Sequence, residues 1–233
     1  MSANNQSAQG GDNHINLYEP HVWKHHTKVA GLEWKNPVGT ASGTFQYAAV
    51  RWFYDVSQLG AVCTKGASPV PWEGNPSPRT AESPAANINA VGLQNPGIDH
   101  YLAEDLPKLK AAGAFVISNV AGHCDDDYAA VVEKLADSDA DMLEINVSCP
   151  NVSAGGMSVG TDPVALANLM DRLRPMTDKP MIVKLTPNVT DITVPARAAV
   201  EHGADALSMI NTLKGMRINI RTGKPIIANV TGG

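Results

Sequence analysis

The chain has 233 residues, of which 43% are hydrophobic and 18% charged, and its net charge is −5. This length and composition indicate a folded protein of one large domain or two small ones, which needs no disulfide or metal for stability. The acidic balance, without any run of Lys or Arg, argues against nucleic-acid binding. No apolar run is long enough to span a bilayer, so we expect no membrane partner and a cytoplasmic location. Residues 1–16 are polar and predict a disordered tail before a single domain over residues 17–233.

In chain order, short apolar runs alternate with amphipathic helical patterns. The predicted strands cover residues 38–42, 61–65, 115–120, 142–147, 181–185 and 206–210. The predicted helices cover residues 47–59, 101–112, 125–136, 163–173 and 194–202. Asp162 and Pro163 suit the N-cap and the first position of their helix. Glycine closes three of the other helices, at Gly60, Gly113 and Gly203.

Repeated βα units with continuously apolar strands predict a parallel sheet covered by helices, either doubly wound or closed into a barrel. Polar side chains recur where successive strands end, namely Ser42, Lys65, Asn119, Asn146, Lys184 and Asn211. A barrel builds its active site from the ends of several strands, whereas a doubly wound sheet uses one switch point. There is also no G-x-G-x-x-G after a first strand. The pattern therefore predicts a (β/α)8 TIM-type barrel, with six of the eight βα units in this chain.

The three cysteines are widely spaced and form no Cys-x-x-Cys pair, so we expect reduced thiols and no metal site. Cys63 lies inside an apolar strand and Cys124 begins a helix, which predicts a structural role for both. Cys149 instead follows a strand, in a loop flanked by Asn146 and Asn151. A thiol in such a place can act as a base or nucleophile, and composition alone would favour a buried structural residue.

Lys65 and Lys184 each follow the apolar core of a strand. Two cations converging on one pocket indicate an anionic ligand or a negative charge that develops during reaction. The alternative is that each lysine extends from the barrel rim into solvent. Residues 89–97 form a loop with two glycines, which is either a plain turn or a backbone lining for a ligand.

Residues 146–151, Asn-Val-Ser-Cys-Pro-Asn, resemble the catalytic loop of the class 1 dihydroorotate dehydrogenases. Six further segments follow the order found in that family, at residues 41–44, 64–66, 89–97, 118–122, 183–185 and 210–212. The resemblance covers residues 29–233. It implies an FMN-containing barrel that oxidises dihydroorotate to orotate in pyrimidine biosynthesis. Cys149 would be the base that removes the C5 proton, while hydride passes from C6 to FMN.

The resemblance also implies roles for the other matching positions. The residues expected to bind substrate are Lys65, Asn89, Val91, Gly92, Leu93, Asn146, Asn211 and Thr212. The residues expected to bind FMN are Ser42, Lys65, Gly66, Asn119, Asn146, Lys184 and Ile210.

Residues 152–163 resemble the class 1B form of the family. That form pairs with an electron-transfer subunit that carries FAD and a 2Fe-2S cluster and uses NAD as the final acceptor. We also expect a homodimer. In the family the chain continues beyond the Thr-Gly-Gly run into two further strands, whose loops hold the FMN phosphate. Two alternatives stay open: another FMN barrel, such as a dihydrouridine synthase, and a flavin-free inactive fragment.

Overall fold

The computed structural model describes residues 26–148 and 158–233, so the predicted tail and Cys149 lie outside the described residues. The strands are β1 (Thr27–Val29), β2 (Leu32–Trp34), β3 (Val62–Cys63), β4 (Thr80–Ser83), β5 (Ala86–Asn89), β6 (Val116–Val120), β7 (Met142–Asn146), β8 (Met181–Lys184), β9 (Ala206–Ser208), β10 (Ile218–Asn219) and β11 (Lys224–Pro225). The α-helices are α1 (Tyr47–Val50), α2 (Ile98–His100), α3 (Leu106–Ala111), α4 (Asp125–Ala136), α5 (Pro163–Leu173) and α6 (Thr193–Glu201). A π-helical stretch, η2 (Tyr101–Asp105), joins α2 to α3, and short 3-10 helices are η1 (Val56–Gln58), η3 (Val159–Thr161) and η4 (Arg174–Met176).

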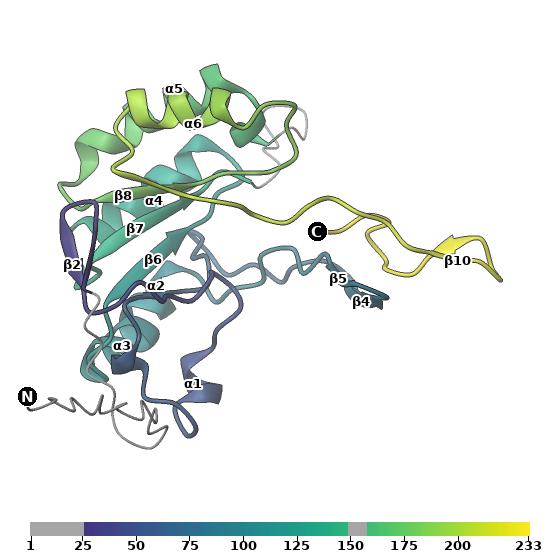
Figure 1. Cartoon of the computed structure of the whole chain (residues 1–233), viewed down its shortest axis with the longest axis horizontal. Coiled ribbons are helices and arrows are strands. Elements are labelled where there is room, and N and C mark those ends of the chain that lie inside the picture. The colour runs from purple at the N-terminus through teal and green to yellow at the C-terminus, as the bar shows by residue number, and fades with distance from the viewer. Residues whose placement is uncertain (1–25, 149–157) are drawn as a thin grey trace, which may run out of the picture.

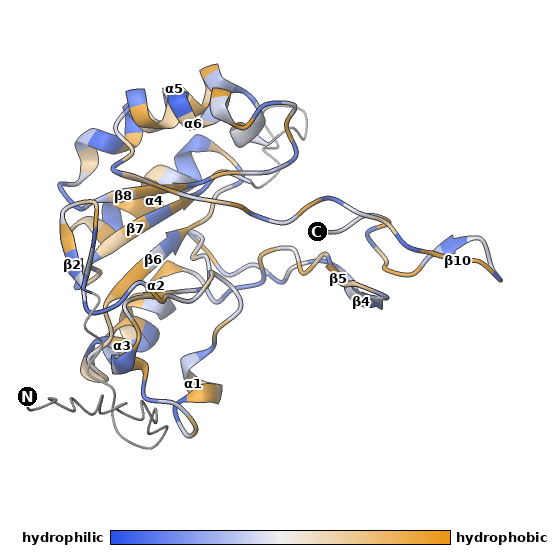
Figure 2. Cartoon of the chain, in the orientation of Figure 1, coloured by the Kyte–Doolittle hydropathy of each residue, from blue (hydrophilic) through white to orange (hydrophobic). Residues whose placement is uncertain are grey.

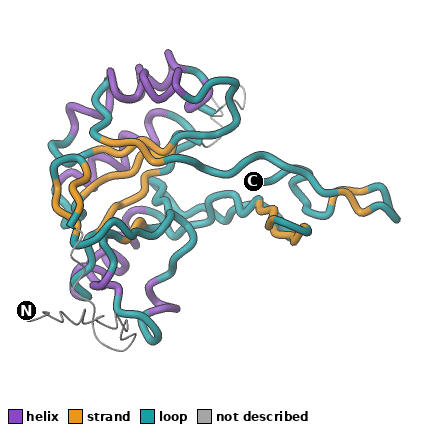
Figure 3. Tube along the Cα trace, viewed as in Figure 1, coloured by secondary structure: helices purple, strands orange, loops and turns teal. Residues whose placement is uncertain are grey.

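Five strands form one parallel sheet in the order β3-β6-β7-β8-β9. This order follows the chain and never reverses, so the sheet has no switch point of the doubly wound kind. The helices between these strands lie along one side of the sheet, as Figures 1 and 3 show. Sequential parallel pairing with helices outside is the winding of a (β/α)8 barrel, and the predicted fold class is confirmed for these units.

The first predicted strand, residues 38–42, is wrong as a full strand, because its ladder is reduced to a single parallel bridge between Gly39 and Ala61. The hydroxyl of Thr40 takes the place of a backbone partner, accepting from the backbone N–H of Cys63 at 2.9 Å. The segment still lies at the β3 edge of the sheet. All six predicted strand positions are therefore present in the predicted order.

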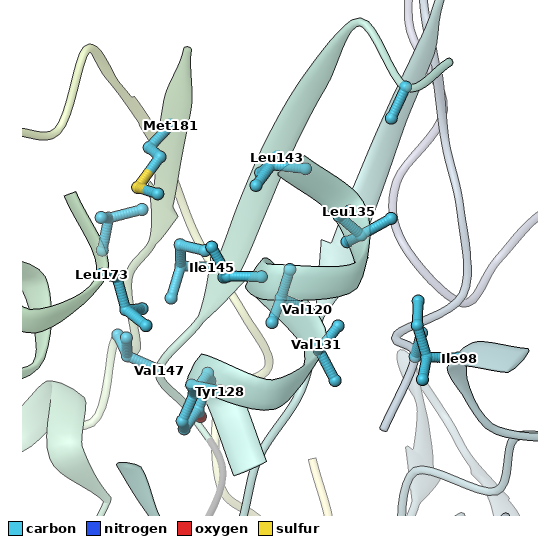
Figure 4. Packing of buried hydrophobic residues seen from close by; sticks show 14 of the residues in the cluster. Ile98, Val120, Tyr128, Val131, Leu135, Leu143, Ile145, Val147, Leu173 and Met181 are labelled. Carbon is cyan, nitrogen blue, oxygen red and sulfur yellow. The ribbon is translucent and has the colours of Figure 1, made fainter. Parts of the chain in front are cut away.

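The outer face of the sheet packs against the helices. Every second strand residue points that way, and the resulting core includes Val120, Leu143, Ile145, Val183 and the helix residues Val131, Leu135, Leu169 and Leu173. Figure 4 shows this packing, and Figure 2 shows the apolar colouring of β6 to β8. Burying this apolar surface is the main source of stability for the described chain.

The helix boundaries follow the local sequence signals. Asp162 caps α5 by accepting hydrogen bonds from the backbone N–H groups of Val164 and Ala165. Gly113 and Gly203 both adopt positive φ, at 75° and 95°, directly after their helices end. The predicted caps and stops at these positions are confirmed.

The predicted helix over residues 47–59 is wrong in its middle, because α1 and η1 are separated by five residues that belong to neither helix. Trp52 and Phe53 in this gap are 74% and 88% exposed. A short helix owes most of its stability to an apolar face packed on the core, and this gap has no such face. Asp55 instead caps η1 through the backbone N–H of Ser57.

Three antiparallel hairpins, β1–β2, β4–β5 and β10–β11, were not predicted. Two of them form arms that project from the sheet, as Figure 1 shows. The arms touch where Arg217 donates to the carbonyl of Glu82 and where the N–H of Ala228 donates to the carbonyl of Pro78 at 2.8 Å. Strands of two to four residues are too short for an alternating pattern to reveal them. None of the helices within residues 26–148 and 158–233 combines the length and apolar character required to cross a membrane.

Candidate active site

The inner face of the sheet has two layers. The lower layer is apolar and consists of Ala61, Cys63, Ile117, Met142 and Ile182. Trp34 of the β1–β2 hairpin packs at its base against Phe115, with ring centroids 5.8 Å apart. Because strand residues two apart share a face, the next inward position along β6, β7 and β8 carries Asn119, Glu144 and Lys184. The inner face of the sheet therefore has a polar layer directly above the apolar layer.

Glu144 is the centre of the polar layer. Its Oε1 accepts a hydrogen bond of 2.6 Å from Nδ2 of Asn119 and one of 3.2 Å from the thiol of Cys63. The same oxygen lies 3.8 Å from Nζ of Lys184. Only 5% of Glu144 and 9% of Lys184 are exposed. A buried charge is tolerated when it is paired and hydrogen-bonded, and these contacts meet that requirement.

Cys63 is a proton donor in this arrangement. Desolvation by burial, followed by the charge of Glu144, raises the pKa of its thiol well above the usual value. The thiol therefore stays protonated at neutral pH and donates to the carboxylate. The prediction that Cys63 is a buried structural thiol is confirmed, with this hydrogen bond as an added function. The backbone of Ser42 also bonds to Cys63, which places this predicted cofactor residue beside the polar layer.

Asn119 leaves one acceptor unused. Its Nδ2 donates to Glu144, and its Oδ1 is buried without a hydrogen-bond partner in the described part of the chain. Gly66 faces this oxygen, since a Cβ at position 66 would lie 2.7 Å from it. An orphaned acceptor is costly in a folded protein, so it indicates a missing donor such as a ligand N–H. Glycine at position 66 avoids the close contact that a Cβ would make with this acceptor.

Lys65 lies at the edge of the polar layer rather than inside it. Its Nζ is 3.5 Å from the position that a Cβ of Gly43 would take. It also lines, with Gly66, a cavity of about 1010 Å³ between β3, the 71–73 loop and the α1 and α3 helices. The two predicted lysines therefore occupy the rim and the interior of one strand-end region.

A second polar group lies beyond the ends of β7 and β9. Nδ2 of Asn211 donates to Oδ1 of Asn146 at 3.1 Å, and Oδ1 of Asn211 accepts from the backbone N–H of Thr212 at 2.7 Å. Asn146 is paired in register with Lys184, so this group adjoins the polar layer. Ile210 precedes Asn211, beyond the end of β9, and is 46% exposed. The structure thus brings together Asn146, Asn211 and Thr212.

Asn89 reaches the same region through the last residue of the chain. Its backbone exchanges two hydrogen bonds of 2.8 Å with Gly233, and its Nδ2 donates to the carbonyl of Gly233 at 3.1 Å. A Cβ at Gly233 would overlap the side chain of Thr212, so these three residues are in close contact.

Residues 91–93, which were predicted to bind substrate, follow β5 of the projecting arm. Gly92 has a φ of 75° and Leu93 a φ of 54°, and the carbonyl of Val91 accepts from the N–H of Asn75 at 3.0 Å. A Cβ at Gly92 would approach the backbone of Asn75 to 2.6 Å, so glycine is required there. Val91 lines the large cavity together with Lys65. No described contact joins this turn to Asn146 or Asn211.

The predicted base, Cys149, lies outside the described residues. The description of this strand end stops at Ser148, whose backbone N–H donates to Oδ1 of Asn146 at 3.4 Å. Cys124, the other predicted structural thiol, is the half-buried N-cap of α4.

Glu144 is the site residue that sequence reasoning missed. It sits between Leu143 and Ile145 in a strand whose five residues are all buried. A carboxylate inside a buried strand needs a partner, and the alternation of the strand places it on the face of Met142 and Asn146. That signal was available in the sequence. Within residues 26–148 and 158–233, no group of three or more His, Cys, Asp or Glu side chains could hold a metal ion.

Comparison with known proteins agrees with this geometry. The sequence profile described as dihydroorotate dehydrogenase matches residues 24–233. The chain is 52% identical over 209 residues to the "Dihydroorotate dehydrogenase B (NAD(+)), catalytic subunit" of Alkaliphilus metalliredigens, covering 88% of this chain and 68% of that protein. It is 51% identical over 209 residues to the protein of the same name from Lachnoclostridium phytofermentans, covering 88% and 69%. It is also 49% identical over 208 residues to a "Putative dihydroorotate dehydrogenase A (fumarate)" of Aquifex aeolicus, again with 88% and 68% covered. The chain belongs to the dihydroorotate dehydrogenase family.

Proposed function

We propose that this chain oxidises dihydroorotate to orotate in pyrimidine biosynthesis, with FMN as its cofactor, and that its catalytic domain spans residues 17–233. The observation that supports this proposal most directly is the polar inner layer around Glu144, which leaves the buried Oδ1 of Asn119 without a partner. In a chain of this family, such a layer is where a flavin ring would be held.

The residues of the polar layer fit an FMN ring. Asn119 offers its unpaired carbonyl oxygen to a ring N–H, and the residue that faces this oxygen is Gly66. Lys184 offers a buried ammonium to ring oxygens and nitrogens, while Ser42 and Lys65 lie at the edge of the same layer. FMN would supply the acceptor for the hydride that leaves C6 of dihydroorotate. The positive charge of Lys184 would stabilise the negative charge that the ring gains on reduction.

The asparagine group would hold the pyrimidine. Asn146, Asn211 and Asn89 each carry both a donor and an acceptor, as the amide groups of dihydroorotate do. A site built from such groups rejects analogues that cannot pair with them, because its own polar atoms would be left unsatisfied. Thr212 adds a hydroxyl beside Asn211. The Val91-Gly92-Leu93 backbone would contribute from the arm.

Cys149 is the proposed base for the C5 proton. It directly follows Ser148, at the end of the strand that carries Glu144 and Asn146. A free thiol has a pKa of roughly 8.5, so it becomes an efficient base once its thiolate is favoured near the substrate.

The names of the relatives also suggest a partner. Two of the three relatives above are named catalytic subunits of a B-type, NAD(+) enzyme. We propose that this chain likewise works with an electron-transfer subunit that carries FAD and a 2Fe-2S cluster and passes electrons to NAD. We further propose that the catalytic chain is a cytoplasmic homodimer.

The decisive experiment compares two cysteine variants in a dihydroorotate oxidation assay with an artificial electron acceptor. Cys149→Ser should lower the turnover number by about 10²- to 10⁴-fold, the usual contribution of a positioned base, while FMN stays bound. The matched control is Cys124→Ser, because Ser is a favourable N-cap for α4 and should leave turnover unchanged. Near-normal turnover of Cys149→Ser would reject Cys149 as the base. A wild-type chain that binds FMN but does not oxidise dihydroorotate would reject the proposed function.

A further inference from the structure

Glu144 has no role in the proposed reaction, yet its carboxylate contacts both predicted site residues of the polar layer, Asn119 and Lys184. It is almost fully buried and has bonds to Asn119 and Cys63 and an ion pair with Lys184. A buried ion pair contributes little to stability, since apolar residues of similar volume often serve as well. The pair with Lys184 is therefore better explained by its effect on the layer than by its effect on folding.

One effect concerns the orientation of the Asn119 amide. A carboxylate can only accept, so the atom of Asn119 that faces Glu144 at 2.6 Å must be the NH2 group. The carbonyl oxygen is then turned toward Gly66, where it is buried and without a partner among the described residues. Glu144 thereby determines that Asn119 presents an acceptor to a ligand.

The other effect concerns charge. The carboxylate lies 3.8 Å from the ammonium of Lys184, with both side chains about nine-tenths buried. The nearby thiol of Cys63 adds no charge, because burial raises its pKa well above the usual value. The polar layer of Lys184, Glu144 and Asn119, with the neutral thiol of Cys63 below it, therefore carries one positive and one negative charge. At low dielectric, each charge acts strongly on whatever lies beside it.

We propose that Glu144 is a positioning residue for the flavin: its carboxylate orients the amide of Asn119 and, by offsetting the charge of Lys184, keeps the reduction potential of the bound ring low. This inference rests on the proposed function, since it requires FMN to bind at the polar layer. A lower potential makes the reduced ring a stronger donor to the next electron carrier.

The test is a double-mutant cycle that removes the charges of Glu144 and Lys184 separately and together. For each full-length protein with FMN bound, the reduction potential of the flavin is measured by dye-coupled titration. The four proteins are the wild type, Glu144→Gln, Lys184→Met and the double variant. Glu144→Gln keeps an acceptor for Asn119 and removes only the negative charge, so the potential should shift to a more positive value. Lys184→Met should shift it to a more negative value, and the double variant should return close to the wild type. Glu104→Gln, in an exposed ion pair with Lys108, is the matched control and should leave the potential unchanged.

The outcomes separate this inference from the proposed function. If the wild type binds FMN and oxidises dihydroorotate but the potentials do not follow the net charge of the layer, the role of Glu144 is rejected alone. A purely structural role would lower flavin occupancy in Glu144→Gln without this order of potentials. Should Glu144→Gln fail to fold, the double variant must still have a more positive potential than Lys184→Met; equal values would overturn the inference. A wild-type chain that binds no FMN would overturn both proposals.

Discussion

Neighbouring residues of β7 face two different environments. Leu143 and Ile145 point outward and are fully buried among α4, α5 and the adjoining strands. Glu144 and Asn146 alternate with them and point inward, where they meet other polar side chains rather than a dry core. One strand of five residues therefore contributes to two surfaces with different chemistry.

The two faces differ in how their side chains contribute to the stability of the fold. The outer face is stabilised by burial of apolar surface, which is non-directional but sensitive to any cavity. The inner face holds a paired charge and an orphaned acceptor, which add little or nothing to stability. Outer-face changes should therefore affect folding first, and inner-face changes that leave no buried charge unpaired should affect ligand binding first.

The largest expected effect is on the outer face. Ile145→Ala should lower the free energy of unfolding by about 2–5 kcal/mol, because it removes buried methyl groups and leaves a cavity under α4. Urea denaturation followed by circular dichroism measures this change. The control is Val164→Ala, at a position that is 66% exposed on α5, which should alter stability by less than about 0.5 kcal/mol. A loss below about 1 kcal/mol for Ile145→Ala would show that the outer face is not the main source of stability.

The next effect is on the inner side. Asn211→Ala removes the donor to Asn146 and should weaken orotate binding by about tenfold or more, while stability falls by only about 0.5–1.5 kcal/mol, the usual net value of one hydrogen bond. Titration of bound flavin absorbance with orotate measures the affinity. Asn87→Ala, on the exposed arm strand β5, is the control and should leave the affinity unchanged. If Asn211→Ala unfolds the chain but leaves the orotate affinity of the folded fraction intact, the contrast between the two faces fails.

Much of the outer face could be predicted from sequence, because its signals are local. The strand and helix patterns of residues 115–185 gave β6, α4, β7, α5 and β8 in order, and Asp162 and Gly113 marked helix boundaries through their own backbone preferences. The arms and the break after α1 could not be predicted. Their conformation depends on contacts between distant segments, such as that of Arg217 with Glu82.

Several residues of the inner face were named from the sequence, but Glu144 and the network around it were not. The strand-end pattern predicted Asn119, Asn146 and Lys184 as site residues, and the register of β6, β7 and β8 with the strand alternation places them on the inner face. The sequence showed neither the pairing of Lys184 with Glu144 nor the orphaned oxygen of Asn119, because both depend on the register of neighbouring strands. The register of a strand depends on the whole sheet, so no single residue in the sequence indicates it.

The smallest expected effect concerns a polar contact on the outer face. The hydroxyl of Tyr101 lies 2.5 Å from Oγ of Ser118, and desolvation by burial raises the pKa of Tyr101 to about 12. The folded chain therefore keeps this proton at pH values where the unfolded chain, with an ordinary pKa near 10, has lost it. Stability from this group is present below about pH 10 and is lost as the pH rises toward 12. Between pH 9 and pH 11 the wild type should lose about 1.4 kcal/mol more than Tyr101→Phe, measured by urea denaturation at each pH.

Tyr101→Phe isolates this group because every other titrating residue, including Cys63 with its raised pKa, is common to both proteins. The phenylalanine variant also loses the hydrogen bond to Ser118, so it should start about 1 kcal/mol less stable at neutral pH, and the two stability curves should cross below about pH 11. Parallel stability curves for the two proteins would mean that the hydroxyl is exposed to water in solution. Water would then reach the outer face near α2 and α3. The difference between an apolar outer face and a polar inner face would hold only for β7 and β8.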